Sequence, residues 1–221
     1  MANEVSKSLT PLRKVLKGYR TSGKALYESC GGELFPCDGL AMAVLDRSLN
    51  IAEGFLLLMP KHGYICAAAL LRMQLDNILR FHGVLSTADP HGTADSLING
   101  TSLRMLKDKT GAKMTDARLL KLLEPQNTWV RSIYEQASDY VHLSSAHVRH
   151  FLSRSSQGKD GRRIFRIGNN DDHLTMEDRR ALIVSFTTVT RGVLSLIDSW
   201  NAHRMNGRSL QELRQRFSRP V

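Results

Sequence analysis

The sequence predicts a mainly α-helical bundle that carries one small β-hairpin insertion near residues 148–168. Over long segments, apolar residues recur every three or four positions, as they do on the buried face of a helix. Aromatic residues make up only 6% of the 221 residues, so a core of aliphatic helices is expected. The alternation of apolar and polar residues that is typical of strands becomes evident only from Val148 onward.

The first three helices are marked by caps and breakers. Thr10 and Pro11 suit a helix start, and Gly31-Gly32 suits its end. Asp38 is expected to cap a second helix, which runs to the break at Pro60. A third helix is predicted over residues 64–85, and because it is apolar on most sides, it should be central in the bundle.

The second half of the chain continues this pattern after a turn-rich, basic segment over residues 86–115. Thr115 should start a short helix that ends near Pro125, and an amphipathic helix should follow through the region of Trp129 to Val141. A hairpin is then expected over 148–168, and Thr175 with Asp178 should cap the longest helix. The domain prediction is one helical domain with a core of about 11–203 and a basic tail over 204–221.

Composition narrows the class of partner. The formal net charge of +10 favours encounter with polyanions such as RNA, DNA or an acidic protein face, although a basic solvated surface would give the same balance. Three cysteines argue against a disulfide scaffold and suit the reducing cytoplasm. The longest uninterrupted apolar runs are far too short to span a membrane, so a soluble cytoplasmic protein is expected. No metal-binding or cofactor-binding motif occurs, so neither a metal nor a cofactor is expected.

The predicted central helix carries a charged stripe formed by Arg72, Asp76 and Arg80, which follow one another at intervals of four residues. Charges on a buried helix must be paired or must line a polar cleft. Two interpretations therefore remain open. The stripe is either part of a functional cleft or an ion-pair ladder along the helix surface.

A second group of candidates lies in the region of Asp139, Tyr140, His142 and His147. Asp139 and His142 are three positions apart, so on one helix the carboxylate would orient the imidazole. In RNA cleavage without a metal, His142 could serve as base or acid and Arg72 could stabilise the charged phosphorane. Tyr140 or His147 could complete such a site, whereas a structural imidazole held by Asp139 is the alternative.

Basic residues gather at the predicted hairpin, among them Arg149, Arg163 and Arg166. A basic ribbon can lie against phosphate groups. It can equally protect a sheet edge from pairing with other chains. We therefore include these three arginines, together with Arg80, Tyr140 and His147, as candidate substrate-binding residues.

The segments ALLRMQLDNILRF and YEQASDYVHLSSAHV, followed by a short basic hairpin and a long helix ending at Trp200, resemble HEPN-type helical proteins over roughly residues 41–203. The resemblance implies a helical bundle, often a homodimer, in some members with metal-independent RNase activity at an arginine–histidine site. It also implies a role in phage defence or toxin–antitoxin growth control. Active members carry the arginine four to six residues before the histidine. No arginine stands there before His142, so Arg72 would have to supply the guanidinium from another helix.

The expected function is thus that of a cytosolic protein that binds or cleaves RNA, with His142, Arg72, Asp139 and Asp76 as the candidate catalytic residues. The residues leave open whether the protein is an enzyme. The alternative is a non-catalytic helical adaptor whose basic surface binds a partner.

Overall fold

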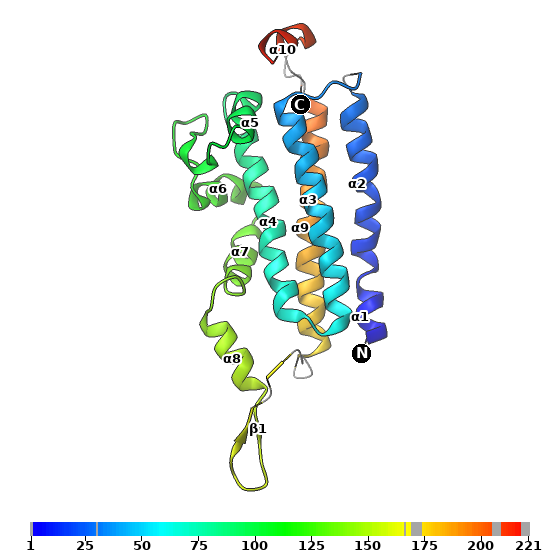
Figure 1. Cartoon of the computed structure of the whole chain (residues 1–221), viewed down its shortest axis with the longest axis vertical. Helices are drawn as coiled ribbons and strands as arrows, with labels where there is room; N and C mark the ends of the chain where they lie inside the picture. The colour runs from blue at the N-terminus through cyan, green and yellow to red at the C-terminus, as the bar shows by residue number, and fades with distance from the viewer. Residues whose placement is uncertain (1, 30, 166, 169–173, 205–208, 218–221) are drawn as a thin grey trace.

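Four long helices form the body of the protein in the computed structural model, which describes residues 2–29, 31–165, 167–168, 174–204 and 209–217. They are α2 (Thr10–Glu28), α3 (Pro36–Leu58), α4 (Tyr64–Leu85) and α9 (Met176–His203). The four run side by side along the long axis, and α9 packs against the other three (Figure 1). The predicted mainly helical bundle is confirmed.

The apolar stripes read from the sequence meet in one core. Phe55 of α3 stacks on Phe186 of α9 with ring centroids 3.9 Å apart, and both side chains are fully buried. On α4, a Cβ added to Gly83 would lie only 2.4 Å from Leu119 Cδ2. The absence of a side chain at Gly83 therefore allows the neighbouring helix to approach closely.

The starts of the first two long helices differ from the prediction. Residues Ala2–Ser8 form a short helix, α1, and α2 follows it almost directly, with the buried Leu9 as its N-cap. Thr10 is therefore inside the helix and does not cap it. Asp38 does cap the start of α3, but as the third residue of the helix, where it accepts a hydrogen bond from the backbone N–H of the N-cap residue Phe35 at 2.9 Å.

Short helices cover the side of α4 that faces away from α2 (Figure 1). They are α5 (Pro90–Ile98), η2 (Leu103–Met105), α6 (Asp116–Leu123), η3 (Glu124–Gln126) and α7 (Val130–Ser138), and a further turn, η1 (Met59–Lys61), joins α3 to α4. Thr115 caps α6 as predicted, because its hydroxyl accepts a hydrogen bond from the backbone N–H of Arg118. These short helices place polar residues opposite the charged stripe of α4.

The hairpin is present, but it is shorter than predicted. Strands β1 (Ser156–Gln157) and β2 (Arg163–Ile164) pair antiparallel, with Ser156 opposite Ile164. Residues Ser145–Ser153 form a helix, α8, where the first strand was expected. Val148, Phe151 and Leu152 are spaced as i, i+3 and i+4, so their pattern also fits a helical period. Together α8 and the hairpin form an arm that projects beyond the bundle (Figure 1).

The basic tail is attached to the bundle by ion pairs. Its helix α10 (Leu210–Arg216) places Arg214 2.6 Å from Glu33, and Arg216 pairs with Asp89. Nearer the end of α9, the buried Arg204 pairs with the buried Asp38, which also accepts a hydrogen bond from Trp200 Nε1 at 2.9 Å. Asp38, which holds this end of the chain, is thus more than 160 residues away from Trp200 and Arg204 in the sequence.

Among the described helices, α9 alone is long and apolar enough to cross a membrane by length and composition. Of its most apolar window, 44% is buried inside the bundle. Its packing against α2, α3 and α4 makes α9 a core helix of the bundle.

Candidate functional site

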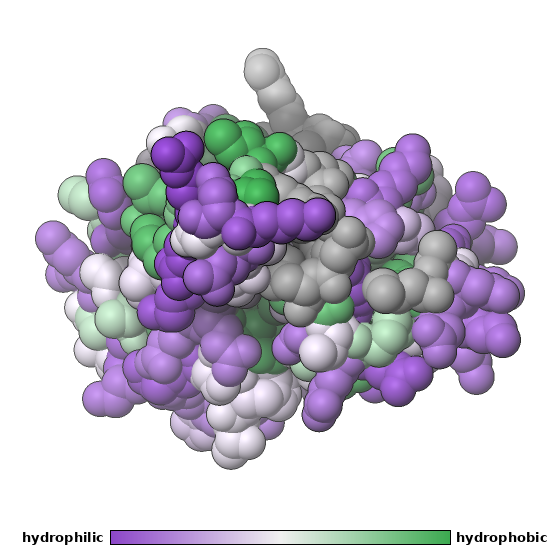
Figure 2. Space-filling view, turned by 90° about the horizontal axis from the view of Figure 1, so that it is seen from below, coloured by the Kyte–Doolittle hydropathy of each residue, from purple (hydrophilic) through white to green (hydrophobic). Residues whose placement is uncertain are grey.

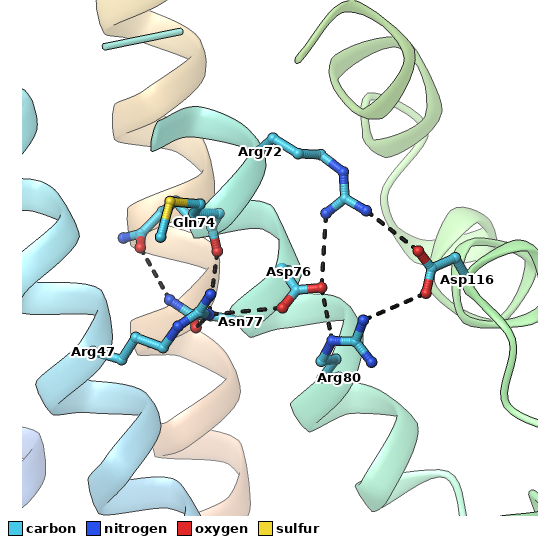
Figure 3. Close-up of polar contacts among 8 residues, drawn as sticks. Arg47, Arg72, Gln74, Asp76, Asn77, Arg80 and Asp116 are labelled. Atoms are coloured by element: carbon cyan, nitrogen blue, oxygen red, sulfur yellow. Dashed lines mark hydrogen bonds and ion pairs between the residues drawn. The ribbon is translucent and has the colours of Figure 1, made fainter. Parts of the chain in front are cut away.

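The charged stripe of α4 forms an ion-pair ladder, one of the two interpretations that its spacing left open (Figure 3). Asp76 lies 2.8 Å from Arg80 Nε and 3.7 Å from Arg72 Nη1. It also lies 3.7 Å from Nη1 of Arg47, which comes from α3. One carboxylate therefore holds three guanidinium groups from two helices.

A second carboxylate closes the ladder from the opposite side. Asp116 of α6 lies 3.4 Å from Arg72 and 3.6 Å from Arg80, and it accepts a hydrogen bond from the Tyr134 hydroxyl at 3.3 Å. The guanidinium carbon of Arg72 lies 4.2 Å above the Tyr134 ring centroid, within range of a cation–π interaction. Three guanidinium groups against two carboxylates leave this arginine cluster (Arg47, Arg72, Arg80, Asp76 and Asp116) with one net positive charge.

His142 and Arg72 line the same pocket. It has a volume of about 270 Å³, and its walls come from α3, α4, the start of α6 and the end of α7. The His142 side chain is exposed, so solvent and ligands can reach it. Arg47, Asp76, Asp116 and Tyr134 are among the other lining residues. The α4–α7 pocket, as we name it, thus brings together three of the four predicted catalytic residues, namely Arg72, Asp76 and His142.

Asp139 does not take part in this pocket. Helix α7 ends at Ser138, so the chain turns between Asp139 and His142 instead of keeping both on one helical face. Both side chains are described, and no hydrogen bond or ion pair joins them. The expectation that Asp139 orients the imidazole of His142 through a shared helix is therefore wrong.

Asp139, Tyr140 and Arg149 instead line a second hollow of about 260 Å³ beside Tyr64. The Tyr140 ring packs edge-on against Tyr64, with centroids 6.1 Å apart, and against His147 at 6.0 Å. Burial raises the pKa of the Tyr140 hydroxyl, more than its hydrogen bond to Tyr64 lowers it. His147 accepts a hydrogen bond from the backbone N–H of Ser144 at 3.4 Å, so it serves the start of α8.

The remaining predicted residues lie on the projecting arm. Arg163 is exposed on β2, and Arg149 donates a hydrogen bond to Ser145 within α8. Arg166 and the side chain of His150 lie outside the described residues. The structure does not bring Arg149 or Arg163 into the α4–α7 pocket.

A basic groove, which the sequence indicated only as scattered charge, lies between α2 and α3. Its volume is about 670 Å³, and Arg13, Lys17, Arg20 and Lys24 line its α2 side. These residues follow a spacing of three or four, so they share one helical face. In the described part of the chain, Arg13, Lys17 and Arg20 have no ion-pair partner, in contrast to the arginines of α4.

A chain of hydrogen bonds leads from the arginine cluster into the core. Arg47 donates to Asn77 Oδ1, and Asn77 donates to Gln74 Oε1 at 3.1 Å. Gln74 donates in turn to Ser48 Oγ at 2.6 Å, and Ser48 shares a 2.7 Å hydrogen bond with the Tyr19 hydroxyl. Burial raises the pKa of Tyr19 to about 12, so this hydroxyl keeps its proton. Every link is satisfied, as buried polar groups require.

Among the residues that the structure describes, no cluster of three or more histidine, cysteine or acidic side chains could hold a metal ion. No family model matches the chain, and no curated protein or solved structure matches it at a significant level. The resemblance to HEPN-type proteins therefore stays a prediction that depends on short motifs.

Proposed function

We propose that the protein binds RNA and that the α4–α7 pocket is the place where it cleaves the strand. The observation that carries this proposal is that Arg72 and the exposed His142, seventy positions apart in the sequence, line one open pocket. An imidazole can exchange a proton near neutral pH, and a guanidinium stays charged and can bind phosphate through two N–H groups.

The chemistry needs no metal. His142 removes the proton from a ribose 2′-hydroxyl, and the 2′-oxygen attacks the adjacent phosphorus. The bond from phosphorus to the 5′-oxygen breaks, water supplies the proton to that leaving oxygen, and a 2′,3′-cyclic phosphate remains. Arg72 stabilises the added negative charge on the phosphorane.

The charge of the arginine cluster supports phosphate binding at this place. Asp76 and Asp116 fix the guanidinium groups without neutralising all of them, because three positive charges face two negative ones. A phosphodiester carries one negative charge and balances the remainder. A group held on rigid helices by several contacts also loses little freedom when the ligand binds.

The basic groove supplies contacts for the rest of the strand. Its lining has four basic residues of α2 and two acidic residues of α3, Asp46 and Glu53, and no ion pair within the described chain holds Arg13, Lys17 or Arg20. Phosphate contacts of this kind give affinity without sequence preference and weaken as salt is added. We therefore expect binding that falls steeply between low and high salt.

Labelled tRNA and total RNA, incubated with the purified protein in the presence of EDTA, test the proposal. Cleavage that ends in a cyclic phosphate should be lost in His142→Ala and in Arg72→Ala. The matched controls, His203→Ala and Arg191→Ala, remove the same side-chain types from exposed positions of α9 and should cleave like the parent protein. Equal cleavage by all five proteins would remove the pocket from the mechanism, and binding without cleavage would leave only the RNA-binding role.

A non-catalytic adaptor is the second candidate, and the projecting arm favours it. Apolar side chains are exposed on α8 and around the hairpin, namely Val148, Phe151, Leu152, Ile164, Phe165 and Ile167. Seen from the end at which the arm projects, the largely hydrophilic surface carries an apolar patch (Figure 2). Monomeric proteins rarely expose large contiguous apolar patches. Self-association that is lost in Phe151→Ser, with RNA left uncleaved by the parent protein, would favour this role and a homodimer.

A further inference from the structure

A third hollow, separate in its lining from the groove on α2, lies between α3, α4 and the segment after α5. Its volume is about 330 Å³. Six large apolar side chains line it, namely Leu40, Val44, Phe81, Val84, Leu97 and Leu103. An apolar hollow of this size is within the range of small-molecule sites.

Polar groups gather on one part of this wall. Arg47, Asp76, Asn77 and Arg80 line the hollow together with the hydroxyl residues Thr101 and Ser102. The two arginines bring two positive charges, and Asp76 brings one negative charge. The hollow thus combines an apolar body with a polar rim of net positive charge.

Both arginines retain hydrogen-bonding capacity. The described contacts of Arg47 all use Nη1, which faces Asp76, Asn77 and the Met73 carbonyl. Those of Arg80 use Nε and Nη2. No contact with a described residue occupies Nε and Nη2 of Arg47 or Nη1 of Arg80. Both side chains are also nearly half exposed, at 44% and 45%, so a ligand can reach them.

We propose that this hollow binds a small amphipathic monoanion, with its apolar part against Val44, Phe81 and Leu97 and its carboxylate or similar head on Arg47 and Arg80. A liquid share of about 30 Å³ per water-sized group leaves room for roughly ten non-hydrogen atoms. A medium-chain carboxylate has this size. A purely apolar ligand would leave the arginines unused, and an inorganic anion would leave the apolar wall exposed to water.

The site goes beyond the proposed RNA function and does not depend on it. It shares Arg47 and Asp76 with the α4–α7 pocket, but its apolar wall belongs to it alone. Ala43 is exposed and lines this hollow without lining the α4–α7 pocket. Ala43→Phe should therefore fill the hollow and leave RNA binding unchanged, which separates the two proposals.

Isothermal titration of the full chain with octanoate and with the isosteric neutral octanamide tests the site. We expect saturable binding of one octanoate and at least about tenfold weaker binding of octanamide, because a hydrogen bond to a charged group is stronger than a neutral one. Arg47→Gln should lose about tenfold in octanoate affinity and clearly less in octanamide affinity, because the neutral amide makes the weaker hydrogen bond. Ala43→Phe should weaken both ligands. Arg20→Gln, which removes a charge from the separate groove on α2, should bind octanoate like the parent protein.

Three results would overturn the proposal. They are an absence of saturable octanoate binding at millimolar concentration, equal affinities for octanoate and octanamide, and unchanged binding by a folded Ala43→Phe variant. The comparison of the two ligands on the parent protein needs no substitution. The proposal therefore stays testable even if a variant does not fold.

Discussion

Asp76→Asn should separate the structural work of the arginine cluster from its binding capacity. Asp76 is 20% exposed and lies within 4 Å of guanidinium nitrogens of Arg47, Arg72 and Arg80. Exposed ion pairs contribute at most about 1 kcal/mol, whereas breaking a buried pair costs about 3–5 kcal/mol. A half-buried carboxylate with three partners falls between these limits, so we expect the free energy of unfolding to fall by about 1–3 kcal/mol.

The same substitution should strengthen anion binding. Removal of one carboxylate raises the net charge of the arginine cluster from one to two and frees N–H groups on three arginines. RNA affinity at low salt should therefore rise while stability falls, and added salt should reduce the gain.

Urea and thermal denaturation followed by circular dichroism measure the loss of stability, and filter binding of labelled RNA measures the affinity. For a chain of this length, a loss of 2 kcal/mol corresponds to a decrease in Tm of roughly 4–8 °C. Asp95→Asn is the matched control, because Asp95 has no described ion pair and lines neither the α4–α7 pocket nor the basic groove. The two variants would have to differ in stability by less than about 0.5 kcal/mol, with equal RNA affinity, to refute the role of Asp76.

Three further predictions concern the fold. Gly83→Ala should destabilise the protein by about 1–3 kcal/mol because its new Cβ would overlap a neighbouring helix, whereas Gly23→Ala, with no atom closer than 3.7 Å, should stabilise it by about 0.5–1 kcal/mol. Equal denaturation midpoints would contradict this packing. Asp38→Ala should lower the free energy of unfolding by about 3–5 kcal/mol, because it leaves Arg204 buried without a counter-charge. In a double-mutant cycle, the effects of Asp38→Ala and Arg204→Met should be strongly non-additive, and additive effects would argue against the ion pair. Burial lowers the pKa of His82, so the unfolded state binds more protons. The neutral His82 side chain makes its full contribution to the free energy of unfolding above the unfolded pKa of about 6.5, and this contribution declines as pH falls. The loss of stability between pH 7 and pH 5 should therefore be smaller in His82→Asn than in the parent protein. Parallel profiles of stability against pH for the parent protein and His82→Asn would contradict this.

Local signals in the sequence were sufficient for much of the helical framework. The bounds predicted for the central helix, residues 64–85, match α4, because the apolar periodicity lies within the segment and the break at Gly63 directly precedes it. The capping box of Thr175 and Asp178 is also formed, since its contacts span only three residues. The prediction of a strand after Val148 was wrong because only Val148 and Leu152 fit the strand period, whereas these two together with Phe151 fit the helix period.

The site was only partly predictable for a related reason. The intervals of four between Arg72, Asp76 and Arg80 make their pairing a local property of one helix. Asp116 and Arg47 join them from other helices, and in the sequence Asp116 was indistinguishable from an ordinary residue in the first turn of a helix. The Asp139–His142 pair failed because it required the helix to continue past Ser138, and helix ends are set by tertiary contacts as much as by propensity.

The hydrogen-bond chain from Arg47 to Tyr19 explains how the bundle can tolerate polar groups in its core next to the arginine cluster. The Gln74 amide bridges three helices, since it donates from α4 to Ser48 Oγ on α3 and to Thr190 Oγ1 on α9, the latter at 3.0 Å. Each of these donors finds an acceptor within the protein, and Asn77 holds the guanidinium group of Arg47 through its Nη1 atom. Its remaining N–H groups are thereby positioned before any ligand arrives. Binding of an anion would therefore cost less side-chain conformational entropy at Arg47 than at a freely moving surface arginine. This preorganisation is the physical reason to seek ligands at this cluster instead of on the more numerous exposed lysines.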